Sequence, residues 1–195
     1  MKINGKILVF ALFCMLIFLG SDTKNPKVLF KTELGNIIVE IYEKDAPITA
    51  KNFLRYVNEN RYEGACFYRV VTIDNQPNND VKIEVIQGGL RSIIDENILP
   101  PIEHETTDKT GILHKDGVLS MARSMPGTAS SEFFICIGDQ PELDFGGKRN
   151  PDGQGFAAFG KVITGMDVVR KIQQQPADGQ MLISKVIIHN IIRVK

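Results

Sequence analysis

The chain has 195 residues, of which 43% are hydrophobic and 24% are charged, and these average values exclude a disordered or low-complexity protein. Its 23 Lys and Arg residues balance its 23 Asp and Glu residues, so overall charge does not favour a nucleic-acid or polyanion binder. The length suits one domain with a full core.

The first 21 residues are typical of a secretory signal. Lys2 and Lys6 precede an unbroken apolar run from Ile7 to Leu19, and polar residues follow at once. The 13 residues of this run are too few for a comfortable membrane span. The sequence therefore predicts a signal peptide, or an uncleaved signal anchor, at residues 1–21, and an exported domain at residues 22–195.

Beyond this segment, the chain consists mostly of short β-rich runs that are separated by turn residues. Residues 27–32 and 36–42 flank Gly35 and predict an antiparallel hairpin. A helix is expected from Pro47, where Ala50, Phe53, Leu54 and Val57 follow at the spacing of one helical face.

A second helix is expected at about residues 165–174. Further strands are expected at residues 66–71, 82–87, 117–122, 132–137, 156–162 and 182–194. Many short strands with two helices, and without regular strand–helix alternation, predict a mainly β fold whose antiparallel sheet closes into a barrel.

The three cysteines are too few for a disulfide scaffold in a chain of this length. Cys14 lies in the predicted signal, whereas Cys66 and Cys136 lie in apolar, strand-like stretches and are expected to be small buried residues. Export to an oxidising compartment leaves a bridge between these two open.

Common catalytic motifs are missing from the sequence. It contains no G-x-S-x-G, no G-x-x-x-x-G-K-[ST], no H-E-x-x-H and no C-x-x-C. His104, His114 and His189 are scattered along the chain, and the acidic neighbours of His104 favour a solvated loop over a ligand set. No metal site and no cofactor are therefore expected.

Polar residues within predicted strands are the remaining signal. Period-two alternation in residues 67–71 predicts that Phe67, Arg69 and Val71 share one face. In the same way Gln87 is expected to point with Val85. Taken singly, such an Arg is more often a surface residue whose stem covers apolar neighbours.

The strand expected at residues 132–137 carries adjacent phenylalanines on opposite faces. Alternation predicts that Phe134 lies with Glu132 and Cys136, opposite Phe133 and Ile135. A core residue is the ordinary interpretation of either ring, so this pattern alone does not establish a site.

Taken together and in this order, six segments resemble the cyclophilin family of peptidyl-prolyl cis-trans isomerases. They are A-P-I-T-A-K-N-F (46–53), F-Y-R-V-V (67–71), I-Q-G-G (86–89), G-V-L-S-M-A-R (117–123), S-S-E-F-F-I (130–135) and F-G-K-V-I-T-G-M-D-V-V (159–169). The resemblance covers about residues 28–194. Residues 100–105 look like the bacterial branch, and residues 145–155 resemble a loop extension of some bacterial members.

The resemblance implies a closed eight-stranded antiparallel barrel that is capped by two helices and carries a shallow substrate groove on its outer surface. It implies catalytic roles for Arg69, Gln87 and Phe134, with Phe134 as the floor of a proline pocket. The expected substrate-binding residues are Phe67, Val85, Ala122, Arg123, Glu132, Leu143 and Phe156. The implied partners are proline-containing polypeptides. The protein is expected to be a monomer that is exported to the periplasm, and to contact the membrane only if its N-terminal segment is retained as an anchor.

Some residues depart from the family pattern. Glu84 stands where an apolar pocket aromatic is usual, Val85 replaces a commoner Met, and Glu132 stands where Gln is usual. Glu142 lies near the position at which cyclosporin-sensitive members carry Trp, and this chain has no Trp. The departures at Glu84 and Val85 predict a more open and more acidic outer pocket, and the absence of Trp predicts weak binding of cyclosporin.

The sequence thus favours an exported isomerase that acts on X-Pro bonds during folding. A binder of proline-containing segments, which acts as a chaperone or assembly module without useful turnover, is the principal alternative. A barrel that encloses a small apolar ligand is less favoured, because Phe133, Ile135 and Met121 are expected to fill the interior.

Overall fold

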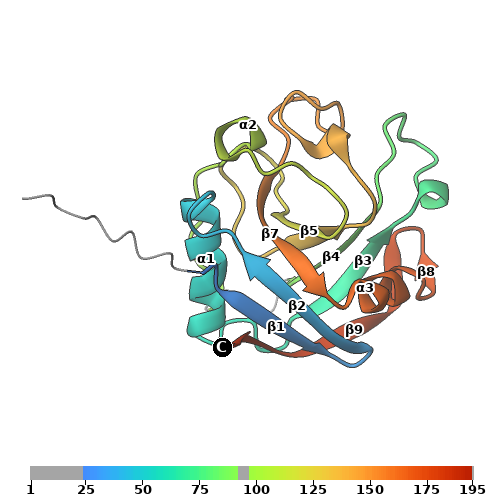
Figure 1. Ribbon diagram of the computed structural model, residues 1–195. Coiled ribbons are helices and arrows are strands. Elements are labelled where there is room, and N and C mark those ends of the chain that lie inside the picture. The colour runs from blue at the N-terminus through green and yellow to red at the C-terminus, as the bar shows by residue number, and fades with distance from the viewer. Residues whose placement is uncertain (1–23, 92–96, 195) are drawn as a thin grey trace, which may run out of the picture.

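The computed structural model describes residues 24–91 and 97–194 (Figure 1). The predicted signal segment at residues 1–21 lies outside these ranges. Within them, no helix has the length and apolar character needed to cross a membrane.

The strands form one antiparallel sheet that closes on itself. In spatial order they are β1 (Lys27–Thr32), β2 (Gly35–Ile41), β7 (Ala157–Thr164), β5 (Val118–Met121), β6 (Phe133–Cys136), β4 (Val85–Gly89), β3 (Cys66–Val71), β9 (Met181–Val194) and β8 (Ala177–Asp178). Pairing of β1 with β9 closes the barrel, and the two-residue β8 only extends β9 beyond it. The expected eight-stranded closed barrel is confirmed.

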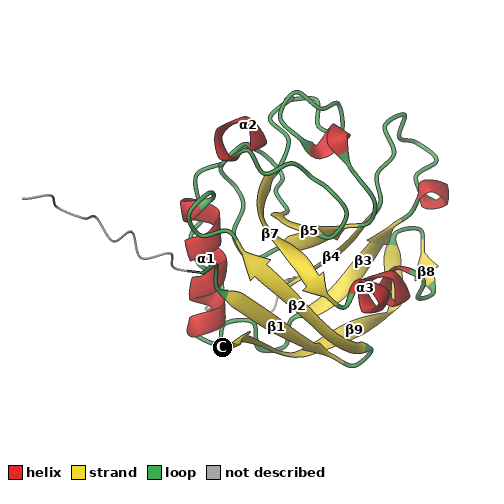
Figure 2. Ribbon diagram, in the orientation of Figure 1, coloured by secondary structure: helices red, strands yellow, loops and turns green. Residues whose placement is uncertain are grey.

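Two helices pack on opposite sides of this barrel (Figure 2). Helix α1 (Pro47–Asn58) begins at a proline, which is tolerated there because the first N–H groups of a helix have no intrahelical acceptor. The helix buries the predicted apolar face. Helix α3 (Met166–Gln173) buries Val169 and Ile172. Both predicted helices are confirmed, and the structure adds a one-turn helix, α2 (Thr107–Thr110), and short 3-10 turns η1 (Ile73–Asn75) and η3 (Pro141–Leu143).

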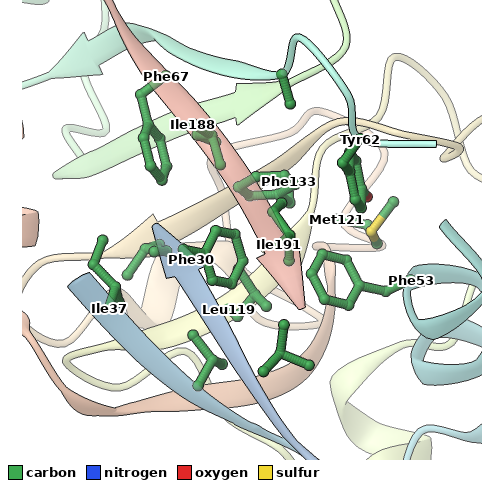
Figure 3. Packing of buried hydrophobic residues seen from close by; sticks show 14 of the residues in the cluster. Phe30, Ile37, Phe53, Tyr62, Phe67, Leu119, Met121, Phe133, Ile188 and Ile191 are labelled. Carbon is green, nitrogen blue, oxygen red and sulfur yellow. The ribbon is translucent and has the colours of Figure 1, made fainter. Parts of the chain in front are cut away.

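Aromatic side chains fill the barrel interior (Figure 3). The Phe133 ring lies 5.5 Å from that of Phe30 and 5.9 Å from those of Phe53 and Phe67, each in an edge-to-face arrangement. All four side chains are fully buried. This packing occupies the space that an enclosed ligand would need, which argues against the ligand-carrying barrel.

Phe67 does not share a face with Arg69, and this expectation was wrong. The pairing of β3 with both β4 and β9 shifts register between Phe67 and Arg69, which marks a β-bulge. An extra residue in one strand breaks the period-two alternation, so Phe67 turns into the interior against Phe133 while Arg69 stays outside. Phe67 is therefore a core residue and lines neither cavity of the groove.

Cys66 and Cys136, the cysteines of the described ranges, lie at opposite ends of β4. Cys66 lies opposite Gly89 and Cys136 lies opposite Val85, which separates them by about 13 Å along the strand direction at ~3.3 Å per residue. A disulfide requires α-carbons within about 7 Å. Both cysteines are buried, as expected, and both are free, so the bridge that the sequence left open is not formed. Burial raises the pKa of both thiols.

Candidate active site

A second, smaller apolar cluster lies on the outer surface of the barrel. Its buried members are Val71, Ile83, Val85, Phe134, Cys136 and Leu143, with Ala122 and Phe156 packed against them. The Phe134 and Phe156 rings meet edge to face at 5.3 Å. A cavity of about 240 Å³ opens over this cluster and provides a slot with an aromatic floor.

Most of the predicted site residues meet at this cavity. Its lining includes Arg69, Val85, Gln87, Ala122, Arg123, Phe134, Leu143 and Phe156. Glu132 instead lines a neighbouring cavity of about 430 Å³, which shares Gln87, Ala122 and Arg123 with the first. Because the two cavities share lining residues, they form one groove along the outside of β4, β5 and β6, which we call the outer groove.

The Arg69 guanidinium is fixed by two uncharged side chains. Gln180 Oε1 accepts hydrogen bonds from Nε at 3.0 Å and from Nη2 at 2.6 Å, and Gln87 Oε1 accepts one from Nη1 at 2.6 Å. Burial lowers the pKa of Arg69, yet an arginine stays charged at neutral pH. Within the described ranges no carboxylate forms an ion pair with it, so the positive charge faces the groove uncompensated.

A chain of hydrogen bonds continues from Gln87. Its amide nitrogen donates to the Tyr68 hydroxyl at 2.8 Å, and this hydroxyl donates to Glu132 Oε2 at 2.5 Å. Burial and then the Glu132 charge raise the pKa of Tyr68, which therefore remains a donor. The network fixes the Gln87 amide with its oxygen toward Arg69.

His114 supports Phe134 from below, and the sequence analysis missed this role. The two rings stack at 5.9 Å with an angle of 14° between their planes. Asp144 Oδ1 accepts from His114 Nδ1 at 2.7 Å, and His114 Nε2 lies 2.9 Å from the Ser120 hydroxyl. This buried arrangement holds the floor of the slot, and its members are too far apart in the sequence to be recognised as a group.

The expected acidic contribution of Glu84 to this pocket is wrong. Its carboxylate lies 3.4 Å from Gln173 Nε2 of α3, and Ile83 lines the cavity instead. The Gln76 amide bonds to the backbone N–H and C=O of Ile83 and so sets the direction of this segment. The sequence analysis also missed Arg149 and Asn150, which line the cavity from the glycine-rich segment 145–155.

Comparison with known proteins identifies this arrangement. The family model described as "Cyclophilin type peptidyl-prolyl cis-trans isomerase/CLD" matches residues 27–193. The chain belongs to the cyclophilin family. It is accordingly an enzyme of the peptidyl-prolyl cis-trans isomerase class.

Bacterial cyclophilins are among its relatives. A peptidyl-prolyl cis-trans isomerase of Acinetobacter baylyi is 42% identical over 155 residues, which cover 78% of this chain and 74% of the relative. Isomerase B of Escherichia coli is 34% identical over 148 residues, which cover 75% and 83%. A Cryptosporidium parvum cyclophilin, solved in the presence of the dipeptide Ala-Pro, shares the fold with a TM-score of 0.70 at 22% identity, covering 87% of this chain and 99% of that one.

Arg123 connects the groove of this cyclophilin to the glycine-rich segment. Its guanidinium pairs with both Asp152 carboxylate oxygens at 2.8 and 2.9 Å, and its Nε donates to the Gly155 carbonyl at 2.9 Å. The hydrogen bonds from Arg123, and then one from the Gln154 backbone N–H, lower the pKa of Asp152 to about 2. The Arg123 charge is thus neutralised, whereas the Arg69 charge is not.

The groove of this cyclophilin offers hydrogen-bond donors and an apolar slot. In the described part of the chain, no three His, Cys, Asp or Glu side chains gather as a possible metal site. Cys66 and Cys136 are buried thiols with raised pKa values, so neither is poised as a nucleophile. The residues present are suited to binding and orienting a peptide.

Proposed function

We propose that this cyclophilin accelerates rotation about X-Pro bonds in exported polypeptides and so assists their folding outside the cytoplasm. The observation that carries the proposal is the Arg69 guanidinium, held by Gln87 and Gln180 at the edge of the Phe134 slot. A proline-containing peptide is the ligand class that fits, and the Ala-Pro dipeptide named for the Cryptosporidium parvum cyclophilin supports it.

Isomerisation of an X-Pro bond requires rotation about the bond and no bond cleavage. Rotation about a peptide bond disrupts amide resonance and has a barrier of about 18–20 kcal/mol. In the twisted state the prolyl nitrogen becomes pyramidal and carries a localised lone pair. An enzyme accelerates this step by binding the twisted state more tightly than either planar state.

Arg69 has the donors to do this. Three of the five N–H groups that an arginine carries are used on Gln180 and Gln87, which leaves two for the substrate. A donor directed at the prolyl nitrogen, or at the adjacent carbonyl oxygen, interacts most strongly when charge builds up there. The Phe134 slot would hold the proline ring while the other side of the bond turns.

The extracytoplasmic part of the proposal rests on the N-terminal sequence. Lys2 and Lys6 followed by the apolar run Ile7–Leu19 have the form of a signal, and the isomerase domain follows it. Exported chains fold where a signal-bearing isomerase would meet them, and uncatalysed X-Pro rotation takes tens to hundreds of seconds.

An exchange experiment separates an enzyme from a binder. Exchange spectroscopy by NMR on a short X-Pro peptide should show faster cis–trans interconversion when catalytic amounts of the protein are added. Saturable binding of the peptide without faster exchange would instead support the non-catalytic chaperone. The same titration reports both quantities.

A fractionation experiment tests the compartment. The protein should be recovered from the extracytoplasmic or membrane fraction, and the mass of its N-terminal peptide distinguishes a cleaved signal from a retained anchor. Recovery from the cytoplasmic fraction alone would contradict export and leave the isomerase activity untouched.

A further inference from the structure

Arg149 brings a further guanidinium into the outer groove, beside those of Arg69 and Arg123. It belongs to the glycine-rich segment 145–155 and lines the same cavity as Arg69 and Phe134. Its Nη1 donates to Gln76 Oε1 at 2.9 Å and to the Val81 carbonyl at 2.6 Å. These contacts, with partners about 70 residues away in the sequence, hold the side chain at the cavity.

The Arg149 charge has no acidic partner in the described ranges, because both acceptors of its guanidinium are uncharged. Burial lowers the pKa of Arg149, and the positive charge of Arg69 lowers it further. The two guanidinium groups therefore repel each other across the cavity. Each retains its charge, since an arginine does not deprotonate at neutral pH.

Nearby carboxylates have other partners. Glu142 accepts the Lys148 backbone N–H at 2.8 Å, Glu84 contacts Gln173, and Asp152 pairs with Arg123. Among the described residues that line this cavity there are three arginines and no Asp or Glu. Because Asp152 neutralises one arginine, two positive charges remain.

At the other end of the groove, positive and negative charges balance. The neighbouring cavity has the Glu132 carboxylate and the Arg91 guanidinium among its lining residues. The Arg91 backbone N–H donates to Glu132 Oε1 at 3.0 Å, and its guanidinium lies over the Tyr68 ring. The groove therefore has a positive end at Arg149 and a near-neutral end at Glu132.

We propose that Arg149 is a specificity-determining residue that favours substrates with an acidic side chain close to the proline, on the Arg149 side of the groove. A substrate carboxylate placed there would relieve the repulsion between the two guanidinium groups. It would also accept hydrogen bonds from the planar Arg149 guanidinium. The attraction gains strength because both cations are partly buried and less screened by water. This inference rests on the proposed isomerase function.

Matched peptides test the preference. Acetylated and amidated X-Pro peptides, so capped that only side chains carry charge, would contain Glu, Gln or Lys at each of the two positions on either side of the proline. We expect kcat/KM for the Glu peptide to exceed that for Gln by about threefold to tenfold at one of these positions, as for a partly exposed ion pair. The Lys peptide should be the poorest, and the ratios should shrink as salt rises.

Variants assign the preference to Arg149. Arg149→Gln should remove the Glu preference, and Arg149→Glu should reverse it toward Lys. A purely structural role for Arg149 would change all peptides alike, so reversal identifies a charge contact. Lys148→Gln is the matched control, because it removes an exposed charge from the adjacent residue, which lines neither cavity of the groove.

The outcomes separate this inference from the proposed function. Equal use of Glu and Gln peptides by an active wild-type enzyme overturns the specificity inference and leaves the isomerase proposal standing. A preference that survives in Arg149→Gln, or that Lys148→Gln also abolishes, overturns the assignment to Arg149. Lack of catalysis on every peptide contradicts the proposed function itself.

Discussion

The two faces of strand β6 carry phenylalanines in very different surroundings, one in the barrel interior and one in the groove. Phe133 points into the barrel, where it packs against other aromatic rings and is fully buried. Phe134, the next residue, points outward into the groove and rests on the polar ring of His114. Alternation along the strand places an interior ring and a groove ring side by side.

The means of support differ between these faces. Interior rings are held by close packing, in which many weak van der Waals contacts keep each side chain in one position. Groove residues are held by directed hydrogen bonds, such as those from Arg69 to Gln180 and from Tyr68 to Glu132. Substitutions on the two faces should therefore separate stability from activity.

Phe133→Ala should have the largest effect, and it should fall on stability. Removing this buried ring leaves a cavity among the aromatic residues of the barrel, which costs about 3–5 kcal/mol of the free energy of unfolding. Denaturant unfolding measures it, and activity per folded molecule should stay close to that of the wild type. A loss below about 1 kcal/mol would show that the interior repacks, against the tight packing described here.

Arg69→Ala should have the opposite signature. Loss of one strong electrostatic donor should cost about 2–4 kcal/mol of transition-state stabilisation, which lowers kcat/KM by about 30-fold to 1,000-fold. The free energy of unfolding should change little. Arg69→Lys should restore little, since a single ammonium lacks the planar fork. Arg170→Ala, which removes a surface arginine paired with Asp116, is the control. Near-wild-type turnover in a folded Arg69→Ala protein would refute the mechanism.

Gln180→Ala should reduce activity through Arg69. Gln180 orients two N–H groups of the guanidinium, and hydrogen bonds to charged groups contribute about 1.5–3 kcal/mol, so we expect about a tenfold loss in kcat/KM. In an Arg69→Ala background, the same change should add almost nothing. Gln175→Ala is the control because Gln175 bonds to the Lys171 carbonyl. Additive losses would mean that Gln180 acts independently of Arg69.

Cys66 and Cys136, which lie opposite the two ends of β4, provide the test with the smallest expected effect. Burial raises the pKa of both thiols, so the reactive thiolate should be scarce at neutral pH and should increase only as the pH rises toward those pKa values. Thiol titration of Cys66 and Cys136 without reductant should find little reaction in the native protein and full reaction after denaturation. Rapid labelling of native Cys136 would contradict its burial.

Local pattern was sufficient for much of the architecture. The apolar spacing after Pro47 correctly predicted the buried face of α1, and alternation correctly separated Phe134 from Phe133. Both signals follow from backbone geometry over a few residues, with a period of 3.6 in a helix and 2 in a strand.

Tertiary structure alone decided the remaining positions. One bulge in β3 reversed the expected direction of Phe67, because an inserted residue shifts every later side chain to the other face. Contacts between distant segments brought Gln180 to Arg69, His114 beneath Phe134, and Arg149 over the slot. Sequence periodicity reports the local direction of a side chain, whereas the partners it meets depend on how the barrel closes and where its loops return.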